Sequence, residues 1–192
     1  MSDLRVHKTK YINETKRVSF KYDGKNYFGY EGDTLASALL ANGVHLIGRS
    51  FKYHRPRGIM SCGSEEPNAI CQISDKNDLT EPNVRATEIE IYDGLEAFSQ
   101  NCWPNVKFDI GGINNLISPL IPAGFYYKTF MWPKSFWKKV YEPLIRMSAG
   151  LGKSPTEPDP DIYDHKYVHY DVLVIGGGLS GICLLYTSDA AD

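Results

Sequence analysis

Hydrophobic and polar residues alternate near the start of the chain and predict a β-hairpin. Val18, Phe20 and Tyr22 are separated by polar residues, so the three fall on one face of a strand. The dipeptide Asp23-Gly24 follows directly and is a strong signal for a two-residue turn. The aromatic-rich stretch YFGY at residues 27–30 supplies the returning strand.

The stretch DTLASALLANG, residues 33–43, predicts a short helix. Leu35, Leu39 and Leu40 form an apolar stripe at helical spacing. The aspartate and threonine that open the stretch can cap the helix N-terminus. Its final glycine can take the left-handed conformation that ends many helices.

Two further strands are expected, at residues 69–73 and 86–92. In the second, β-branched residues alternate with glutamates. The order of hairpin, helix, loop and strands over residues 17–98 fits a small α+β domain of the β-grasp type, in which a sheet wraps one helix. Residues 1–16 are interpreted as a flexible arm.

Residues 99–152 differ in composition from the residues before them and are interpreted as an aromatic-rich interdomain and helical segment. Eight aromatic residues lie within residues 125–141. A helix is predicted over residues 135–149, with Pro143 kinking or interrupting it. The aromatic side chains serve either to pack one domain onto another or to form a flavin-stacking or substrate surface. Residues 153–169, rich in proline and aspartate, are a linker by composition.

A nucleotide-binding fingerprint occupies residues 170–181. It begins with the continuously apolar run VLVI, which is typical of a strand buried on both faces of a parallel sheet. Gly176, Gly178 and Gly181 then satisfy the pattern G-x-G-x-x-G: the first permits a tight turn, the second lets the backbone approach a pyrophosphate, and the third lets the helix pack closely. The stretch predicts the first strand and glycine loop of a truncated α/β Rossmann domain. A glycine-rich turn without a ligand is the alternative.

Eleven residues, ICLLYTSDAAD, follow Gly181. A complete dinucleotide-binding domain would continue as an apolar helix, and an acidic residue about 20 positions on would hold the ribose. The stretch shows neither an apolar helical stripe nor a second strand, and it resembles the translation of sequencing-adapter read-through. We therefore interpret residues 182–192 as a non-native tail and expect the natural chain to continue.

Charge and hydropathy argue against several classes of protein. The net charge of -2 is too small and of the wrong sign for bulk electrostatic binding to nucleic acid or to a membrane surface. No apolar run approaches the roughly 20 residues that span a bilayer. The N-terminus has no apolar signal core. We expect a cytoplasmic protein with no nucleic acid or membrane partner.

The four cysteines lack the spacing of a metal site. Eight residues separate Cys62 from Cys71, thirty separate Cys71 from Cys102, and Cys183 falls in the tail. A plant-type [2Fe–2S] cluster needs C-x₄-C-x₂-C with a distant fourth cysteine, and zinc sites need closely paired ligands. We expect no iron–sulfur cluster and no metal site.

A basic segment runs from Arg49 to Arg57 and interleaves cationic residues with Phe51 and Tyr53. It is too short, on a slightly acidic chain, to indicate nucleic acid binding. It is either a solvated or interdomain loop, or a contact for a nucleotide or flavin phosphate or for an acidic partner surface. The sequence does not decide its role.

Several segments, taken in order, resemble one protein family. They are GDTLASALLANGV, GRSFKYHRPRGI, GSEEPNA, DGLEAFSQNCWPNVKFDIG, AGFYYKTFMWP and DVLVIGGG. Together they are similar to the N-terminal part of the α subunits of heterotetrameric sarcosine oxidases, over about residues 15–181.

This resemblance implies a ferredoxin-like N-terminal domain that lacks its cluster, followed by a region that binds NAD through Gly176, Gly178 and Gly181. It also implies a complex with β, γ and δ subunits that contains FAD and FMN. That complex oxidises sarcosine to glycine with release of hydrogen peroxide, and tetrahydrofolate can take up the one-carbon unit as 5,10-methylenetetrahydrofolate. No catalytic residue can be carried over, and we expect the fragment alone to be inactive.

Two alternatives to this function stay open. The chain also fits a subunit of a related amine or amino-acid dehydrogenase, of the hydrogen cyanide synthase or the opine and proline dehydrogenase type. The second alternative is a non-catalytic assembly module.

Overall fold

The computed structural model describes residues 4–5, 10–74, 80–120, 124, 130–152, 154–158 and 162–189. The chain divides into two compact units, Met1–Pro158 and Asp159–Asp192. The strands all lie in the first unit: β1 (Asn13–Tyr22), β2 (Lys25–Glu31), β3 (Gly48–Arg49), β4 (Pro56–Arg57), β5 (Ile70–Ser74), β6 (Thr80–Arg85) and β7 (Glu96–Ser99).

The predicted hairpin is confirmed as β1 and β2, which pair antiparallel. Val18, Phe20 and Tyr22 are at most 5% exposed, because alternate residues of β1 face the core. The turn residues Asp23 and Gly24 both have positive φ, 47° and 73°. Positive φ at both positions is the type I′ geometry, whose twist matches that of the two strands.

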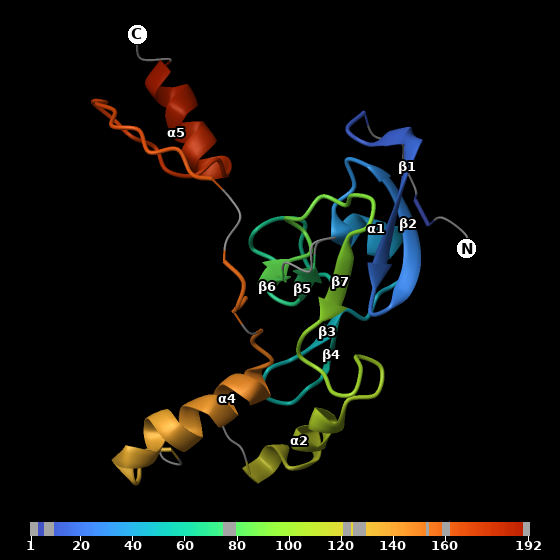
Figure 1. Cartoon of the computed structure of the whole chain (residues 1–192), viewed down its shortest axis with the longest axis vertical. Helices are drawn as coiled ribbons and strands as arrows, with labels where there is room; N and C mark the ends of the chain where they lie inside the picture. Colours follow the sequence, from blue (N-terminus) through green and yellow to red (C-terminus); the bar gives the residue numbers. More distant parts are fainter. Residues whose placement is uncertain are drawn as a thin grey trace. The chain divides into compact units, whose positions relative to one another are not determined.

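The main sheet has the strand order β2-β1-β7-β5-β6. β1 and β7 run parallel, whereas the other neighbours run antiparallel. Figure 1 shows β1, β2 and β7 side by side, with the helix α1 (Leu35–Ala41) against them. A mixed sheet packed on one helix is the small α+β domain that the sequence predicted.

Helix α1 forms where the apolar stripe predicted a helix. Leu35 and Leu39 are fully buried, whereas Leu40 is 37% exposed and lies outside the core. Thr34 caps the N-terminus by accepting a hydrogen bond from the backbone N–H of Ser37. Gly43 follows the helix with φ of 75°, which a side chain would strain.

The prediction of a strand at residues 86–92 is wrong. This segment instead supplies hydrogen-bond acceptors to the N-terminus of α1. Ala86 and Ile89 accept hydrogen bonds at 2.8 Å from the backbone N–H groups of Ala36 and Leu35, the first residues of α1. Helix N-termini leave such donors without intrahelical partners, so the segment satisfies them. The strand of this region lies earlier in the sequence, as β6.

The N-terminal residues that the structure describes are tied to the domain. The backbone N–H of Leu4 donates to Ala41 O at 3.0 Å. The guanidinium of Arg5 forms a two-pronged ion pair with Asp33, whose side chain is fully buried. β1 begins at Asn13, so part of the expected arm over residues 1–16 is strand.

Short helical elements follow the sheet between residues 110 and 149. They are η1 (Ile110–Gly112), α2 (Ile113–Leu116), η2 (Ser118–Leu120), η3 (Lys134–Phe136), η4 (Trp137–Tyr141) and α4 (Glu142–Ala149). Of the aromatic segment, residues 125–129 lie outside the described residues.

The helix expected over residues 135–149 is present but changes its winding twice. It runs through a 3₁₀ turn, η3, and a π-helical turn, η4, before α4 begins. Pro143 accounts for the break, because it has no N–H and its ring crowds the carbonyl four residues earlier. Gly150 ends α4 in the left-handed conformation, with φ of 67°.

The second unit contains α5 (Leu179–Asp189). Within the described ranges, no helix has the length and apolar character needed to cross a membrane.

Prediction on Asp33. Replacing Asp33 with alanine is expected to lower the free energy of unfolding by about 3–5 kcal/mol, because Arg5 loses its buried partner. Urea denaturation would measure the loss. Glu31→Ala is the matched control: its pair with Lys16 is exposed to solvent, so the midpoint should barely move. Equal effects of the two substitutions would contradict this account.

Candidate functional site

The glycine loop at residues 176–178 joins an extended segment to the N-terminus of α5. Gly176 has φ of 110°, in the region that residues with side chains rarely adopt. A side chain added at Gly177 or Gly178 would meet no atom within 4 Å. The backbone at Gly178 is therefore open to close approach, as the fingerprint requires.

Gly181 lies directly against the loop. A Cβ atom added there would come within 2.1 Å of the carbonyl oxygen of Gly176 and 3.5 Å of the Val174 side chain. The first turn of α5 closes over the loop, since the N–H of Ile182 donates to Gly178 O at 3.0 Å. The structure thus brings the first and third glycines of the fingerprint together, and close packing requires a glycine at 181.

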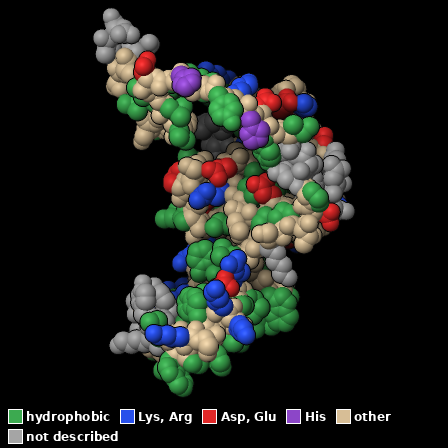
Figure 2. All heavy atoms as spheres, turned by 60° about the vertical axis from the view of Figure 1, so that its left-hand side comes forward, with side chains coloured by type: hydrophobic (Ala, Val, Ile, Leu, Met, Phe, Trp, Pro, Cys, Tyr) green, Lys and Arg blue, Asp and Glu red, His purple; other side chains and the backbone are tan. Residues whose placement is uncertain are grey.

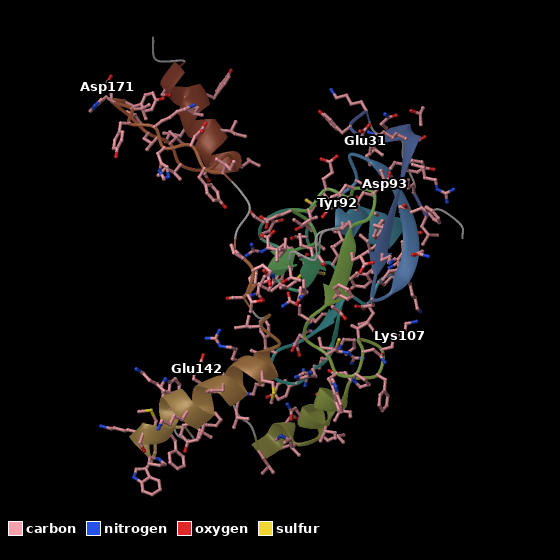
Figure 3. The ribbon with its side chains drawn as sticks, in the orientation of Figure 1. Glu31, Tyr92, Asp93, Lys107, Glu142 and Asp171 are labelled. Atoms are coloured by element: carbon pink, nitrogen blue, oxygen red, sulfur yellow. The ribbon has the colours of Figure 1, made fainter. Side chains whose placement is uncertain are left out.

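The apolar run 172–175 is not a strand in the structure. It belongs to no regular element, and Val172, Leu173 and Ile175 are 75%, 67% and 89% exposed. A parallel strand needs neighbours on both sides for its hydrogen bonds and burial. The Rossmann strand accordingly stays a prediction. Figure 3 labels Asp171, which opens this run.

Residues 182–189 of the expected tail continue α5 as a regular helix. Apolar residues lie all round it and are exposed to solvent: Leu179, Ile182, Leu184, Leu185 and Tyr186. An amphipathic helix would concentrate such residues on one face.

A second structured site surrounds Glu66, which the sequence analysis did not single out. Its carboxylate is buried and accepts four backbone N–H groups: from Met60 at 2.7 Å, Ser61 at 2.6 Å, Asn68 at 2.8 Å and Ala69 at 3.2 Å. Burial acts to raise the pKa of Glu66, but these donors outweigh it and hold the pKa below its ordinary value. Glu66 therefore fixes the loop between β4 and β5 as an anion.

The basic segment forms a small hairpin that is anchored to the chain after β7. β3 and β4 pair antiparallel at its base. Arg49 donates to the carbonyl oxygens of Val106 and Lys107, at 2.8 and 2.9 Å. Figure 3 labels Lys107 in this loop. Arg49 thus has a structural role, because its guanidinium donates hydrogen bonds to backbone carbonyl groups.

His54 and Asp109 form the second link between the same two segments. His54 Nδ1 lies 2.6 Å from Asp109 Oδ2, with both side chains largely buried. Asp109 Oδ1 also accepts the backbone N–H groups of Trp103 and Gly111. A Cβ atom at Gly111 would come within 2.3 Å of His54 Nδ1, so a glycine is needed there for the approach. The sequence offered no signal for this pair, whose members are 55 residues apart.

A cavity of about 260 Å³ lies beside this hairpin. Its lining includes Arg57, Asn68 and Asn101. The amide of Asn101 donates to Arg49 O at 2.6 Å, so it too holds the hairpin in place.

Among the described cysteines, Cys71 is buried and Cys102 is partly buried, whereas Cys62 and Cys183 are exposed. Burial raises the pKa of the Cys71 thiol to about 12 and also raises the pKa of Cys102. A protonated thiol is a poor nucleophile and a poor metal ligand. Among the residues that the structure describes, no group of three or more His, Cys, Asp or Glu side chains is placed to hold a metal ion.

Part of the first unit is similar to a known domain family. Residues 15–102 match the family model described as a 2Fe-2S iron-sulfur cluster binding domain. This match corrects the expectation that the chain belongs to a protein without an iron–sulfur cluster. That expectation relied on the spacing of four cysteines, whereas the family model compares the sequence over residues 15–102. The described side chains themselves form no set of cluster ligands.

The particular relatives are sarcosine oxidase subunits, as the resemblance predicted. The chain is 54% identical over 191 residues to sarcosine oxidase subunit alpha of Rhizobium meliloti (strain 1021), and 31% identical over 173 residues to that of Corynebacterium sp. (strain U-96). These matches cover 100% and 89% of the chain. The chain is therefore a homologue of sarcosine oxidase alpha subunits.

The chain spans only part of these relatives, namely 19% of the first and 13% of the second. Among solved structures, L-proline dehydrogenase from P. horikoshii matches with 24% identity and a TM-score of 0.37, over 49% of this chain and 17% of that one. So low a TM-score carries no argument about fold or function.

Prediction on Glu66. Because the folded-state pKa of Glu66 is lowered, its contribution to stability is present above the unfolded pKa of about 4.3 and is lost as the pH falls through the folded value. Glu66→Gln should reduce the free energy of unfolding at pH 7 by about 2 kcal/mol, since four donors lose a charged acceptor. The variant should also lose less stability than the parent chain when the pH falls from 5 to 3.

Denaturation at several pH values would test both parts. Glu81→Gln, at an exposed position on β6, is the control and should follow the parent chain at every pH. Parallel pH profiles for Glu66→Gln and the parent chain would contradict the role assigned to Glu66.

Proposed function

We propose that this chain is the N-terminal part of a sarcosine oxidase alpha subunit. The complete enzyme would oxidise sarcosine to glycine with release of hydrogen peroxide, and in the presence of tetrahydrofolate it would form 5,10-methylenetetrahydrofolate. The observation that carries the proposal is the 54% identity over 191 residues to the Rhizobium meliloti subunit. Identity of this level over the whole chain is far more specific than a glycine fingerprint.

Within that enzyme, residues 170–181 would begin a dinucleotide-binding domain. Gly178 would admit the pyrophosphate to the backbone, and the N-terminal N–H groups of α5 would face its negative charge. The open backbone at Gly178 and the contact between Gly181 and Gly176 support this role. A bound dinucleotide would supply hydride-transfer chemistry, whereas these residues only bind and orient it.

In this proposal the described residues of the chain have no catalytic role. Burial raises the pKa of the Cys71 and Cys102 thiols, Arg49 donates hydrogen bonds to backbone carbonyls, and His54 is engaged by Asp109. The oxidation of sarcosine would therefore depend on other parts of the polypeptide and on beta, gamma and delta subunits. In this proposal the domain has a scaffolding role within an oxidoreductase.

Prediction on activity. Residues 1–181 of this chain, exchanged for the matching part of subunit alpha in the Rhizobium meliloti enzyme, should give an assembly that oxidises sarcosine. The 192-residue chain alone should show no turnover. Oxygen uptake with sarcosine, compared with uptake with L-proline, would measure both. An assembled chimera without sarcosine-dependent oxygen uptake would contradict the proposal.

Prediction on the glycine loop. In the same chimera, Gly178→Ala should weaken NAD binding by about tenfold or more without changing the melting temperature, because the new methyl group meets only the incoming ligand. Gly181→Ala should lower the melting temperature as well, because its methyl group would collide with Gly176 O.

Gly177→Ala is the matched control, since position 177 is equally open and is not part of the fingerprint. Isothermal titration with NAD and thermal unfolding would be measured for all three variants. Unchanged NAD affinity in Gly178→Ala would remove the loop from the proposed site.

A further inference from the structure

The helical segment from η4 to α4 exposes a row of large apolar side chains. Trp137, Val140, Leu144 and Met147 recur at spacings of three and four residues and are 48%, 37%, 51% and 74% exposed. We call these four residues the apolar stripe. Side chains at such spacings lie on one side of a helical segment. Contiguous exposed apolar surface of this kind marks an interaction site in soluble proteins.

The surroundings of the apolar stripe are mostly cationic. Lys134, Lys138, Lys139 and Arg146 lie along the same segment, where Glu142 is the one acidic residue of positions 134–147. Arg146 pairs with Glu142 through its Nε at 2.8 Å. Figure 2 shows hydrophobic side chains interspersed with Lys and Arg in the part of the molecule that holds α2 and α4, and Figure 3 labels Glu142 on α4.

An open cleft adjoins one end of the apolar stripe. Its volume is about 780 Å³, and Met147 forms part of one wall. Gln72 of β5 and Ser99 of β7 also line it. The surface is therefore concave at this end, a shape that suits a protruding protein element better than a flat lipid surface.

We propose that the apolar stripe is covered by the rest of the same longer polypeptide, through a surface that is apolar at its centre and acidic at its rim. This inference rests on the proposed function, because it takes the chain to be part of an alpha subunit. The Rhizobium meliloti relative matches this chain over 19% of its length, so roughly four-fifths of that polypeptide lies outside the match. Acidic side chains at the rim would complement Lys138 and Lys139.

Methionine oxidation offers an internal comparison for the test. Met147 and Met60 are 74% and 77% exposed in this chain, so hydroxyl radicals should oxidise them at similar rates if nothing covers either. In the assembled chimera described above, Met147 should be oxidised about fivefold more slowly than Met60, because an interface core excludes solvent. Each rate is normalised to that of the same residue in the denatured chain.

Rates within a factor of about two of each other would overturn the proposal. So would protection of Met147 that appears only with vesicles containing phosphatidylserine, because a lipid surface would then be the partner. Protection that requires the beta, gamma or delta subunits, or that disappears on dilution, would point to another chain and would also overturn it.

A pair of substitutions adds a second measurement. Met147→Asp should lower the melting temperature of the assembled chimera, because it places an anion in the buried centre of the interface. Tyr11→Asp, at a position that is 78% exposed, should leave the melting temperature unchanged. Equal effects of the two substitutions would count against the interface. Sarcosine oxidation by the unsubstituted chimera reports separately on the proposed function, so the two failures can be told apart.

Discussion

Asp33, whose side chain is buried, joins four parts of the domain, two of which are distant from it in sequence. Its oxygens accept hydrogen bonds from Arg5, from the backbone N–H of Tyr30 at 2.9 Å and from the hydroxyl of Ser37 at 2.8 Å. Its backbone carbonyl accepts the N–H of Ile91 at 2.9 Å. The N-terminal residues, the end of β2, the start of α1 and the segment after β6 therefore meet at one residue. A fully buried charge is tolerable only because each of these partners compensates its desolvation.

Glu66 applies the same principle to a loop. A long connection between short strands cannot bury enough apolar surface to fix its own shape, so its backbone donors need another partner. The carboxylate of Glu66 gathers donors from both ends of residues 60–69. Asp109 does likewise for residues 103–111 and adds His54 from the basic hairpin. Three buried carboxylates thus organise the loops around a small apolar core, whose largest fully buried members include Phe20, Leu35 and Leu39.

The sequence could predict features that depend on residues close together in the chain, but not features that depend on contacts between distant residues. The hairpin at Asp23-Gly24 and the helix capped by Thr34 are set by neighbouring residues, and both were predicted. Residues 86–92 were assigned to a strand because apolar residues alternate there, but their carbonyls meet the N-terminus of α1, a contact between segments some fifty residues apart. The link between His54 and Asp109 is equally non-local. The cysteine spacing misled the cofactor expectation, because it is a local pattern and the domain family is defined over residues 15–102.

In the glycine fingerprint, some features are determined by nearby residues and others require the rest of a domain. The positive φ of Gly176 and the contact of Gly181 with its carbonyl oxygen involve residues only five positions apart. The run 172–175 depends on neighbouring strands and stays exposed. The turn is therefore encoded by its own residues, whereas the strand requires the remainder of a domain. A phosphate needs the turn, the helix N-terminus and a neighbouring wall at once, so this segment can specify how a dinucleotide would be oriented without being able to enclose one.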